Sequence, residues 1–308
     1  MDFINKLIPR KKEIEFEITV KNEDNHQKYR LELMSNEIFF FPIFGAKEDI
    51  KGSVNIHVPG RNRLEHTGIS IQLIGVVIDF SNGVVTHEFL QEERSLEPAG
   101  VIMGKKSYKY SFKKVSKKFE SYYGMNVRVR YCLRVVATRP YRPNLVEEKE
   151  IWIIRKEKEP QSMHPIRMEV GVEECLQIEF KFDKDTYNLN DMITGNIHFI
   201  LARIRILHMD IELIRKEIVG SGDREVIESE VLTKFEIMDG LPVKDEVIPV
   251  RMYLKPYDLT PSFRSVDRLF SLKYFINLVL VDSEERRFFK QQEIILWRAT
   301  EESEDRKS

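Results

Sequence analysis

The segment from residue 127 to 135 reads Val127-Arg128-Val129-Arg130-Tyr131-Cys132-Leu133-Arg134-Val135, and apolar residues alternate in it with three arginines and a cysteine. Successive side chains of a β-strand point to opposite faces of a sheet, so this alternation predicts a strand with one buried face. The same period of two recurs along the chain, at Ile14–Val20, Ile69–Leu73, Leu176–Phe182, Ile248–Leu254 and Leu272–Leu280. Half-buried strands therefore account for most of the sequence.

Turn signals lie between these predicted strands, as in Ser81-Asn82-Gly83, Gly220-Ser221-Gly222-Asp223 and Asp239-Gly240. They are spaced for hairpins and too closely for regular helical crossovers. The predicted class is all-β, built of antiparallel sandwiches.

One segment, 197–218, fits two structures. Its isoleucines and leucine also match a helical stripe. Enrichment in isoleucine and the bracketing Gly195 and Gly220 favour strands, because β-branched side chains pack well on a pleat and lose rotamer freedom in a helix. The pattern alone does not exclude a helix.

The chain has 308 residues, near the length at which one hydrophobic core divides into two. The best linker candidate is the polar segment Lys156–Pro165, which carries two prolines and lacks apolar alternation. We therefore predict one domain over residues 1–160 and another over 161–300, followed by a disordered charged tail at 301–308.

Composition predicts a reduced, cytosolic protein. The 49 basic and 50 acidic side chains leave a net charge of -1, so no global field attracts nucleic acid. Cys132 and Cys175 are too few to cross-link a secreted scaffold. The densest apolar stretch, Ile38–Phe44, is far too short to span a bilayer, and the first residues show no signal peptide or myristoylation motif. Any membrane association is therefore expected to be peripheral.

Local charge is less even. Between Lys105 and Arg142 there are twelve basic residues and one acid, Glu120. Such a segment could rest on anionic lipid headgroups, and its densest run supplies the candidate residues Lys113, Lys114, Lys117 and Lys118. Equally, lysines protect exposed edge strands from aggregation. The sequence does not choose between these interpretations.

Motifs for catalysis or metal binding are missing. The Gly104-Lys105-Lys106 string has Ala99 in place of the first P-loop glycine and lacks the final hydroxyl residue. The seven histidines show no short ligand spacing, and the acidic groups at 147–150 and 282–285 are typical of solvated loops. We predict neither an enzyme nor a cofactor or metal site.

Several strings resemble one known family, the arrestin-like subunit of retromer, also called the vacuolar protein sorting-associated protein 26 family. The resemblance runs from about residue 14 to 298. The longest and most specific string is Arg286–Arg298, with Gln291-Gln292 and Trp297-Arg298 inside it. The others are Met168–Leu176, Lys234–Gly240, Asn277–Asp282, Arg63–Ile69, Thr86–Phe89 and Glu120–Tyr131.

This resemblance implies the arrestin-like fold, two antiparallel β-sandwich domains joined by a short linker, and strands over 197–218. It implies a non-enzymatic coat subunit that docks on retromer's helical-solenoid scaffold subunit. Such a subunit helps sort transmembrane cargo from endosomes, in retrograde transport to the Golgi and in recycling. The expected location is cytoplasmic and peripheral on endosomal membranes.

The resemblance also implies site residues. The loop matching Glu236-Ile237-Met238-Asp239-Gly240 binds the scaffold subunit in the family, and Ile237 and Met238 beside a turn would expose two apolar side chains. One of them could instead pack inward under the turn. Val170 and Phe289 match positions that hold a hydrophobic cargo signal together with a sorting nexin. Alternation alone would equally accept Phe289 as a core residue.

Two departures from the family limit what carries over. Ala46 replaces an acid in the loop Phe44–Asp49, through which some members bind a PDZ-bearing sorting nexin, so we do not predict that partner. The lysine run from 105 to 118 is also more basic than is usual in the family. Two rivals remain: a free arrestin-domain adaptor, which would carry Pro-Pro-x-Tyr motifs that this chain lacks, and the related subunit of retriever.

Overall fold

The computed structural model describes residues 14–33, 35–172, 175–220, 222, 225–240 and 242–300. The predicted tail at 301–308 lies outside the described residues. The chain divides into two compact units. Unit 1 holds the described residues up to Tyr123 together with Arg128–Arg155, and unit 2 holds Gly124–Val127 together with the residues from Lys156 onward. Between the last strand of unit 1 and the first of unit 2, residues 155–165 form only one isolated bridge, between Glu157 and Ala299.

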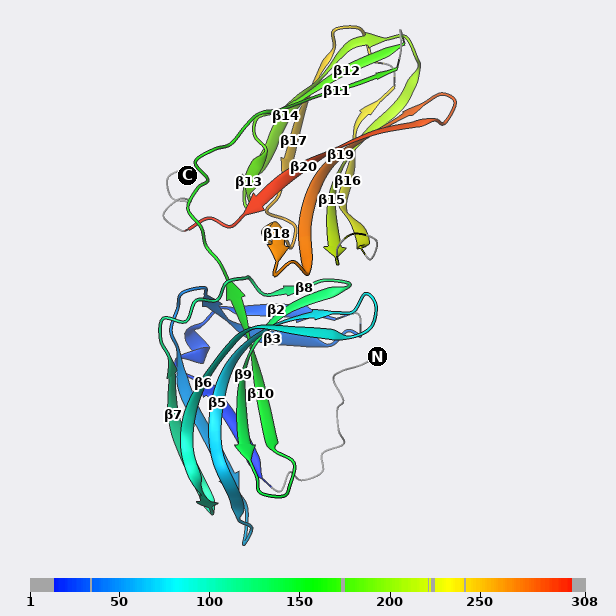
Figure 1. Ribbon diagram of the computed structural model, residues 1–308. Helices are drawn as coiled ribbons and strands as arrows, with labels where there is room; N and C mark the ends of the chain where they lie inside the picture. The colour runs from blue at the N-terminus through cyan, green and yellow to red at the C-terminus, as the bar shows by residue number, and fades with distance from the viewer. Residues whose placement is uncertain are drawn as a thin grey trace. The chain divides into compact units, whose positions relative to one another are not determined.

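Unit 1 consists of two sheets (Figure 1). The smaller sheet has the order β1-β4-β7, and the seven-stranded sheet has the order β2-β3-β10-β9-β5-β6, with β8 paired to β9. Strands β3 and β10 pair in parallel, whereas β1 with β4, β4 with β7, β2 with β3, β9 with β10, β5 with β6 and β8 with β9 pair antiparallel. The strands are β1 (Glu15–Val20), β2 (Lys28–Glu32), β3 (Ile38–Gly45), β4 (Ile50–Val58), β5 (Leu64–Asp79), β6 (Val85–Ile102), β7 (Gly104–Phe112), β8 (Tyr122–Tyr123), β9 (Val127–Thr138) and β10 (Leu145–Ile154), and a single 3-10 turn, η1 (Glu23–Asn25), follows β1.

Unit 2 also consists of two sheets. One has the order β11-β12-β14-β17 and the other the order β13-β20-β19-β15-β16, with β18 paired to β19. The strands are β11 (Ile166–Val172), β12 (Leu176–Phe182), β13 (Thr186–Asn188), β14 (Met192–Ala202), β15 (Ile206–Val219), β16 (Val226–Asp239), β17 (Val247–Tyr253), β18 (Phe263–Val266), β19 (Phe270–Asp282) and β20 (Arg287–Trp297). The all-β prediction is therefore confirmed.

The alternating segment at 127–135 lies in β9, at the centre of the larger sheet of unit 1. Val127, Val129, Tyr131, Leu133 and Val135 are all fully buried. The intervening arginines, at 128, 130 and 134, are half-buried on the other face of the strand. A side-chain period of two thus builds the core, as the pattern predicts.

The ambiguous segment 197–218 forms the end of β14 and nearly all of β15, so the strand interpretation is correct. Buried positions in it include Ile197, Phe199, Ile206, Met209 and Ile211. The helical stripe has no structural meaning, because its residues do not share one element: Ile200 lies in β14, Ile204 lies between the strands, and the others lie in β15.

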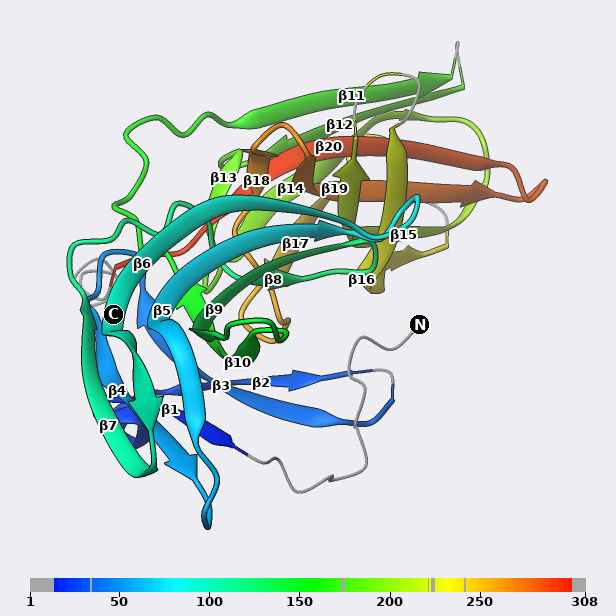
Figure 2. The same ribbon diagram turned by 60° about the horizontal axis from the view of Figure 1, so that its bottom comes forward.

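The two units share one connectivity. In each, a long hairpin ends its sheet, β5–β6 in unit 1 and β15–β16 in unit 2, and the β5–β6 hairpin curves along the edge of unit 1 in both views (Figures 1 and 2). The final strand of each unit runs parallel to an early one, β10 to β3 and β20 to β13. Each also pairs a short strand with its penultimate long strand, β8 with β9 and β18 with β19.

Candidate docking surfaces

Strand β16 ends the larger sheet of unit 2, and among the described strands it pairs with β15 alone. Two bulges interrupt the pairing. Leu213 and Ile214 face Thr233 and Val231, which leaves Leu232 without an opposite residue, and Met209 and Asp210 face Met238 and Glu236, which leaves Ile237 without one. Bulges at a sheet edge twist the strand, redirect side chains and hinder pairing with another strand.

Ile237 and Met238 therefore lie at the second bulge, in the last residues of β16, and not in a loop as the sequence suggested. Both side chains are half-buried. Asp239 is exposed and pairs with His208, and the turn begins only at Gly240, whose backbone has a φ of +106° and whose N–H donates to the Leu207 carbonyl at 2.8 Å. The positive φ at Gly240 is one that glycine adopts without strain.

Sequence reasoning missed a polar group next to this bulge. Asp210 on β15 is buried, and its carboxylate oxygen Oδ2 lies 2.9 Å from Lys234 Nζ and 3.6 Å from His208 Nε2. Glu212 on the same face accepts a hydrogen bond of 2.7 Å from Asn277 Nδ2. The signal that could have indicated this cluster was the position of Asp210 and Glu212, two residues apart and interleaved with the apolar Met209, Ile211 and Leu213.

Val170 lies on β11, at one edge of the four-stranded sheet of unit 2. The side chain is half-buried. Pairing of β11 with β12 is continuous from Ile166 opposite Phe182 to Val172 opposite Leu176, without a bulge. This edge is regular, and such edges accept an added strand.

Phe289 lies on β20, opposite Val279, in the other sheet of unit 2. Its side chain is 69% exposed, so the alternative that it is a core residue is wrong. Strand β13 covers β20 only from Ile295 to Trp297, so among the described strands the 287–294 part of β20 pairs with β19 alone.

Val170 and Phe289 thus belong to different sheets of one unit. The turns beside them lie at the same end of that unit: Arg203 N–H donates to the Cys175 carbonyl at 2.7 Å, and Ser283 N–H donates to the Arg205 carbonyl at 2.9 Å.

The predicted lysine patch contains one error. Lys117 is buried, and its Nζ donates to the Glu48 carbonyl at 2.6 Å and, over 3.4 Å, to the Val115 carbonyl. Burial lowers the pKa of this amine, against the opposing effect of Glu48 and Asp49. Lys113, Lys114 and Lys118 are exposed. Lys117 cannot contact a membrane because its hydrogen bonds are made inside unit 1.

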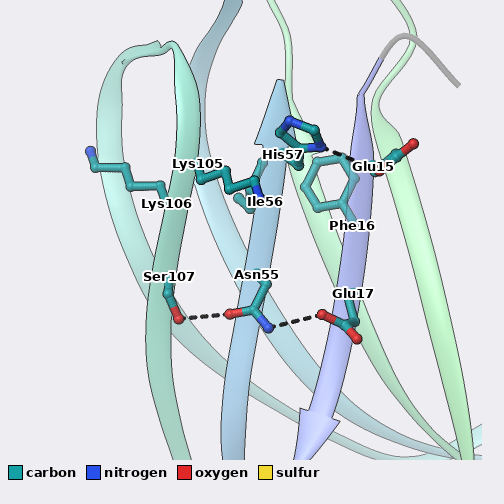
Figure 3. A pocket seen from close by; sticks show the side chains of 9 residues that line it. All are labelled: Glu15, Phe16, Glu17, Asn55, Ile56, His57, Lys105, Lys106 and Ser107. Carbon is teal, nitrogen blue, oxygen red and sulfur yellow. Dashed lines mark hydrogen bonds and ion pairs between the residues drawn. The ribbon is translucent and has the colours of Figure 1, made fainter. Parts of the chain in front are cut away.

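The outer face of the sheet β1-β4-β7 carries an open hollow of about 700 Å³ (Figure 3). Polar side chains cross it in two rows, Glu15–His57–Lys105 and Glu17–Asn55–Ser107. Asn55 Nδ2 donates to Glu17 Oε2 at 3.0 Å, and Ser107 Oγ donates to Asn55 Oδ1 at 2.7 Å. These groups bond to one another across the strands, as cross-strand pairs do, and leave no array of nucleophile and base.

Three further observations concern chemistry and membranes. Cys132 and Cys175 are free, and burial raises the pKa of the Cys132 thiol to about 12. Within the described ranges, no three side chains of His, Cys, Asp or Glu come together as a metal site. No helix in the part of the chain that the structure describes is long and apolar enough to cross a bilayer.

Comparison with known proteins gives a consistent result. The family model described as vacuolar protein sorting-associated protein 26 matches residues 10–285. A protein of that name from Dictyostelium discoideum is 47% identical over 257 residues, which cover 83% of this chain and 74% of that protein. One from Schizosaccharomyces pombe is 39% identical over 96% of this chain and 98% of its own length. Vacuolar protein sorting-associated protein 26B of Arabidopsis thaliana is 40% identical over 93% of this chain and 94% of its own length.

Proposed function

The chain belongs to the vacuolar protein sorting-associated protein 26 family, a family of retromer subunits, and from this premise we propose that it docks on the helical-solenoid scaffold subunit through the second bulge of β16. The observation that carries this proposal is the position of Ile237 and Met238. Two adjacent apolar side chains lie half-buried at the end of an edge strand, just before the turn at Gly240.

The bulges decide how a partner can bind there. A strand with two bulges makes a poor template for a further strand, so the contact is made by side chains. Flexible Met238 can fit an irregular surface between helices, and Ile237 adds a rigid apolar contact. The ion pair of Lys234 with buried Asp210 fixes the strand three to four residues before these anchors.

The test is calorimetry with the purified scaffold subunit. The double variant Ile237→Asp, Met238→Asn should bind at least about 100-fold more weakly than the wild type, because charged or polar groups replace both central anchors. Val231→Asp is the matched control, since Val231 lies on the same strand with 52% exposure but away from the second bulge. It should bind as the wild type does. Unchanged binding by a double variant with a native melting curve would refute the docking site.

We further propose that the regular edge of β11 receives an extended segment of a membrane cargo tail, in cooperation with a sorting nexin. Backbone groups along β11 would pair with the segment, while Val170 and exposed Phe289 provide apolar contacts for its side chains. The contrast with β16 supports this assignment, because β11 has no bulge to prevent strand addition.

Cargo capture is tested with cytosolic-tail peptides of membrane cargo, the assembled complex and a sorting nexin. Phe289→Asp should lose most peptide binding. Val247→Asp serves as the control, because Val247 is 54% exposed on β17, at the opposite edge of the four-stranded sheet. Peptide recruitment by Phe289→Asp at the wild-type level would dispose of the cargo role.

The complete proposal is a non-enzymatic coat subunit that acts in the cytoplasm and is peripheral on endosomal membranes. The similarity to vacuolar protein sorting-associated proteins 26 favours this over a free arrestin-domain adaptor or a retriever subunit. If the wild-type protein does not bind the scaffold subunit, those two alternatives become the better explanations of its function.

A further inference from the structure

Three turns of unit 1 meet at one end of its two sheets: β4–β5 (59–63), β6–β7 (around Met103) and β9–β10 (139–144). The first two turns lie side by side, because Val58 pairs with Gly104 and Leu64 pairs with Ile102 on the strands that flank them. The third joins them because Thr67 Oγ1, near the start of β5, donates to the Thr138 carbonyl at the end of β9, over 3.4 Å. Figure 1 shows all three at the lower end of unit 1.

This end of unit 1, which we call the turn end, is positively charged. The segments 59–63, 101–106 and 138–144 contain six basic residues and no acid: Arg61, Arg63, Lys105, Lys106, Arg139 and Arg142. Lys106 pairs with Glu97, and Arg139 donates twice to the Pro143 carbonyl, at 2.8 Å from Nε and 2.6 Å from Nη2. The other four are exposed and form no ion pair with another described residue.

Exposed apolar side chains stand among these charges. Met103 is 67% exposed and Tyr141 is fully exposed, at the tips of two of the turns. Tyr141 adopts a φ of 57°, a backbone conformation uncommon for a bulky residue. The two bonds from Arg139 to the Pro143 carbonyl close the loop that carries Tyr141. A fully exposed aromatic ring in an uncommon backbone conformation is a costly arrangement for a surface that faces only water.

The predicted lysine patch has a different setting. Lys113 and Lys114 follow the far end of β7, whose nine residues separate them from Lys105 by about 27 Å. Asp49 lies among them: it accepts a hydrogen bond from the Lys114 N–H at 3.0 Å and pairs with Lys51, also at 3.0 Å. The acid and the burial of Lys117 reduce the positive charge that this end can present.

We propose that the turn end of unit 1 rests on an anionic phospholipid bilayer, with Arg61, Arg63, Lys105 and Arg142 at the headgroup phosphates and Met103 and Tyr141 in the interfacial layer. Basic groups near an anionic surface gain affinity from its potential, and exposed Tyr and Met add apolar contact at the boundary with the acyl chains. The inference deepens the proposed peripheral location and is independent of scaffold docking.

The test is flotation of the purified full chain with vesicles of phosphatidylcholine alone or with roughly one third phosphatidylserine. The wild type should bind only the anionic vesicles, and binding should weaken strongly in high salt because the charges are exposed. Arg61→Glu with Arg63→Glu should lower the affinity by on the order of 25-fold or more, at roughly fivefold for each of the two basic groups lost. Met103→Ser with Tyr141→Ser, which leaves the charge unchanged, should lower it severalfold.

The matched control is Lys113→Glu with Lys114→Glu, which makes the same change in charge at the other end of unit 1. It should stay within about threefold of the wild type, because these lysines lie too far away to contact the same bilayer. Equal losses in both charge variants, equal binding to neutral vesicles, or full binding by a folded Arg61→Glu, Arg63→Glu variant would each overturn the proposal. Calorimetry with the scaffold subunit on the same variants separates this failure from failure of the docking site.

Discussion

Strands β6 and β16 occupy the same place in their two units and differ in what they present. Each ends the larger sheet beside a long partner, β5 or β15, and each carries two bulges. In β6 the residues without an opposite partner are Phe89 and Leu96, and in β16 they are Leu232 and Ile237. The strand order and the two bulges at this edge, which we call the frame, are therefore repeated in the two units.

The residue after the second bulge differs. In β6 it is Glu97, which accepts hydrogen bonds from Lys106 at 2.5 Å and from Tyr108, and these bonds hold the pKa of its carboxyl below the usual range. In β16 it is Met238, half-buried and apolar. The β6 edge hydrogen-bonds to β7 of its own unit. The β16 edge carries the apolar pair Ile237 and Met238, which we propose contacts the scaffold subunit. A shared frame thus leaves binding specificity to a few residue identities.

The largest expected effect is on the free energy of unfolding, and it tests whether the two smaller sheets are also built alike. Gly52 on β4 and Gly195 on β14 sit in central strands of the two smaller sheets, each against a neighbouring backbone. A Cβ at Gly52 would lie 1.9 Å from the Thr19 carbonyl oxygen, and one at Gly195 would lie 2.3 Å from the Lys181 carbonyl oxygen. Gly52→Ala and Gly195→Ala should each lower the free energy of unfolding by about 3 kcal/mol or more, measured by denaturant titration.

Gly68→Ala is the control for both variants. Its nearest contact would be the Glu97 carbonyl oxygen at 3.8 Å, so the free energy of unfolding should change by less than about 1 kcal/mol. A large loss in only one of the two tight variants would show that the two smaller sheets are not built alike.

Much of this frame is predictable from sequence, because alternation reports which face of a strand is buried. The connection between β7 and β8 follows the same period: Val115, Lys117 and Phe119 alternate in sequence with exposed residues and are all buried, although they lie outside the strands. For Lys117 this period was better evidence than the charge. Phe289 is similar, since it shares its phase with exposed Arg287, Gln291 and Glu293. The phase was not evident from the sequence, because the adjacent Phe288 is also aromatic and two neighbouring apolar residues interrupt the alternation.

The bulges could not be predicted in this way. A bulge adds one residue to one strand without a characteristic composition, so Ile237 and Met238 read as a loop although they end a strand. The turn end of unit 1 could not be predicted as one surface for another reason. Its basic residues are far apart in sequence and come together only because β5 pairs with β6 and lies beside β9.

A smaller effect should distinguish two counterpart tyrosines. Tyr131 on β9 and Tyr274 on β19 are both buried, two residues beyond the position that pairs with the short strand, β8 or β18. The Tyr131 hydroxyl donates to the Phe119 carbonyl at 2.8 Å and accepts from the Phe119 N–H at 3.2 Å, whereas the Tyr274 hydroxyl accepts from the Thr260 N–H at 3.3 Å.

Tyr131→Phe should therefore lower the free energy of unfolding by about 2–3 kcal/mol, since it leaves two buried backbone groups unpaired, and Tyr274→Phe by about 1 kcal/mol. Thermal and denaturant unfolding both measure this. Tyr253→Phe, with its ring 62% exposed, should be neutral. Equal costs at 131 and 274 would mean that the hydroxyls play the same part in both units.

The smallest effect concerns the histidines third in β5 and β15, His66 and His208. His66 is 2% exposed, neither ring nitrogen has a hydrogen-bond partner among the described residues, and burial lowers its pKa below 6.5 despite Glu97, with Lys106 acting in the same direction as burial. His208 is partly exposed, and its Nε2 lies 3.6 Å from Asp210. Of the two, only His66 is fully buried with no hydrogen-bond partner for its ring among the described residues.

A histidine with a lowered pKa in the folded state binds its proton more readily after unfolding, so the protein should lose stability as the pH falls below about 6.5. His66→Leu should remove this share of the pH dependence and leave the stability at neutral pH equal or higher, because no buried nitrogen then lacks a partner. Denaturant unfolding across this pH range gives the slope for each protein. If His66→Leu keeps the wild-type slope, the acid sensitivity comes from other groups, and the two units differ less at this position than their burial indicates.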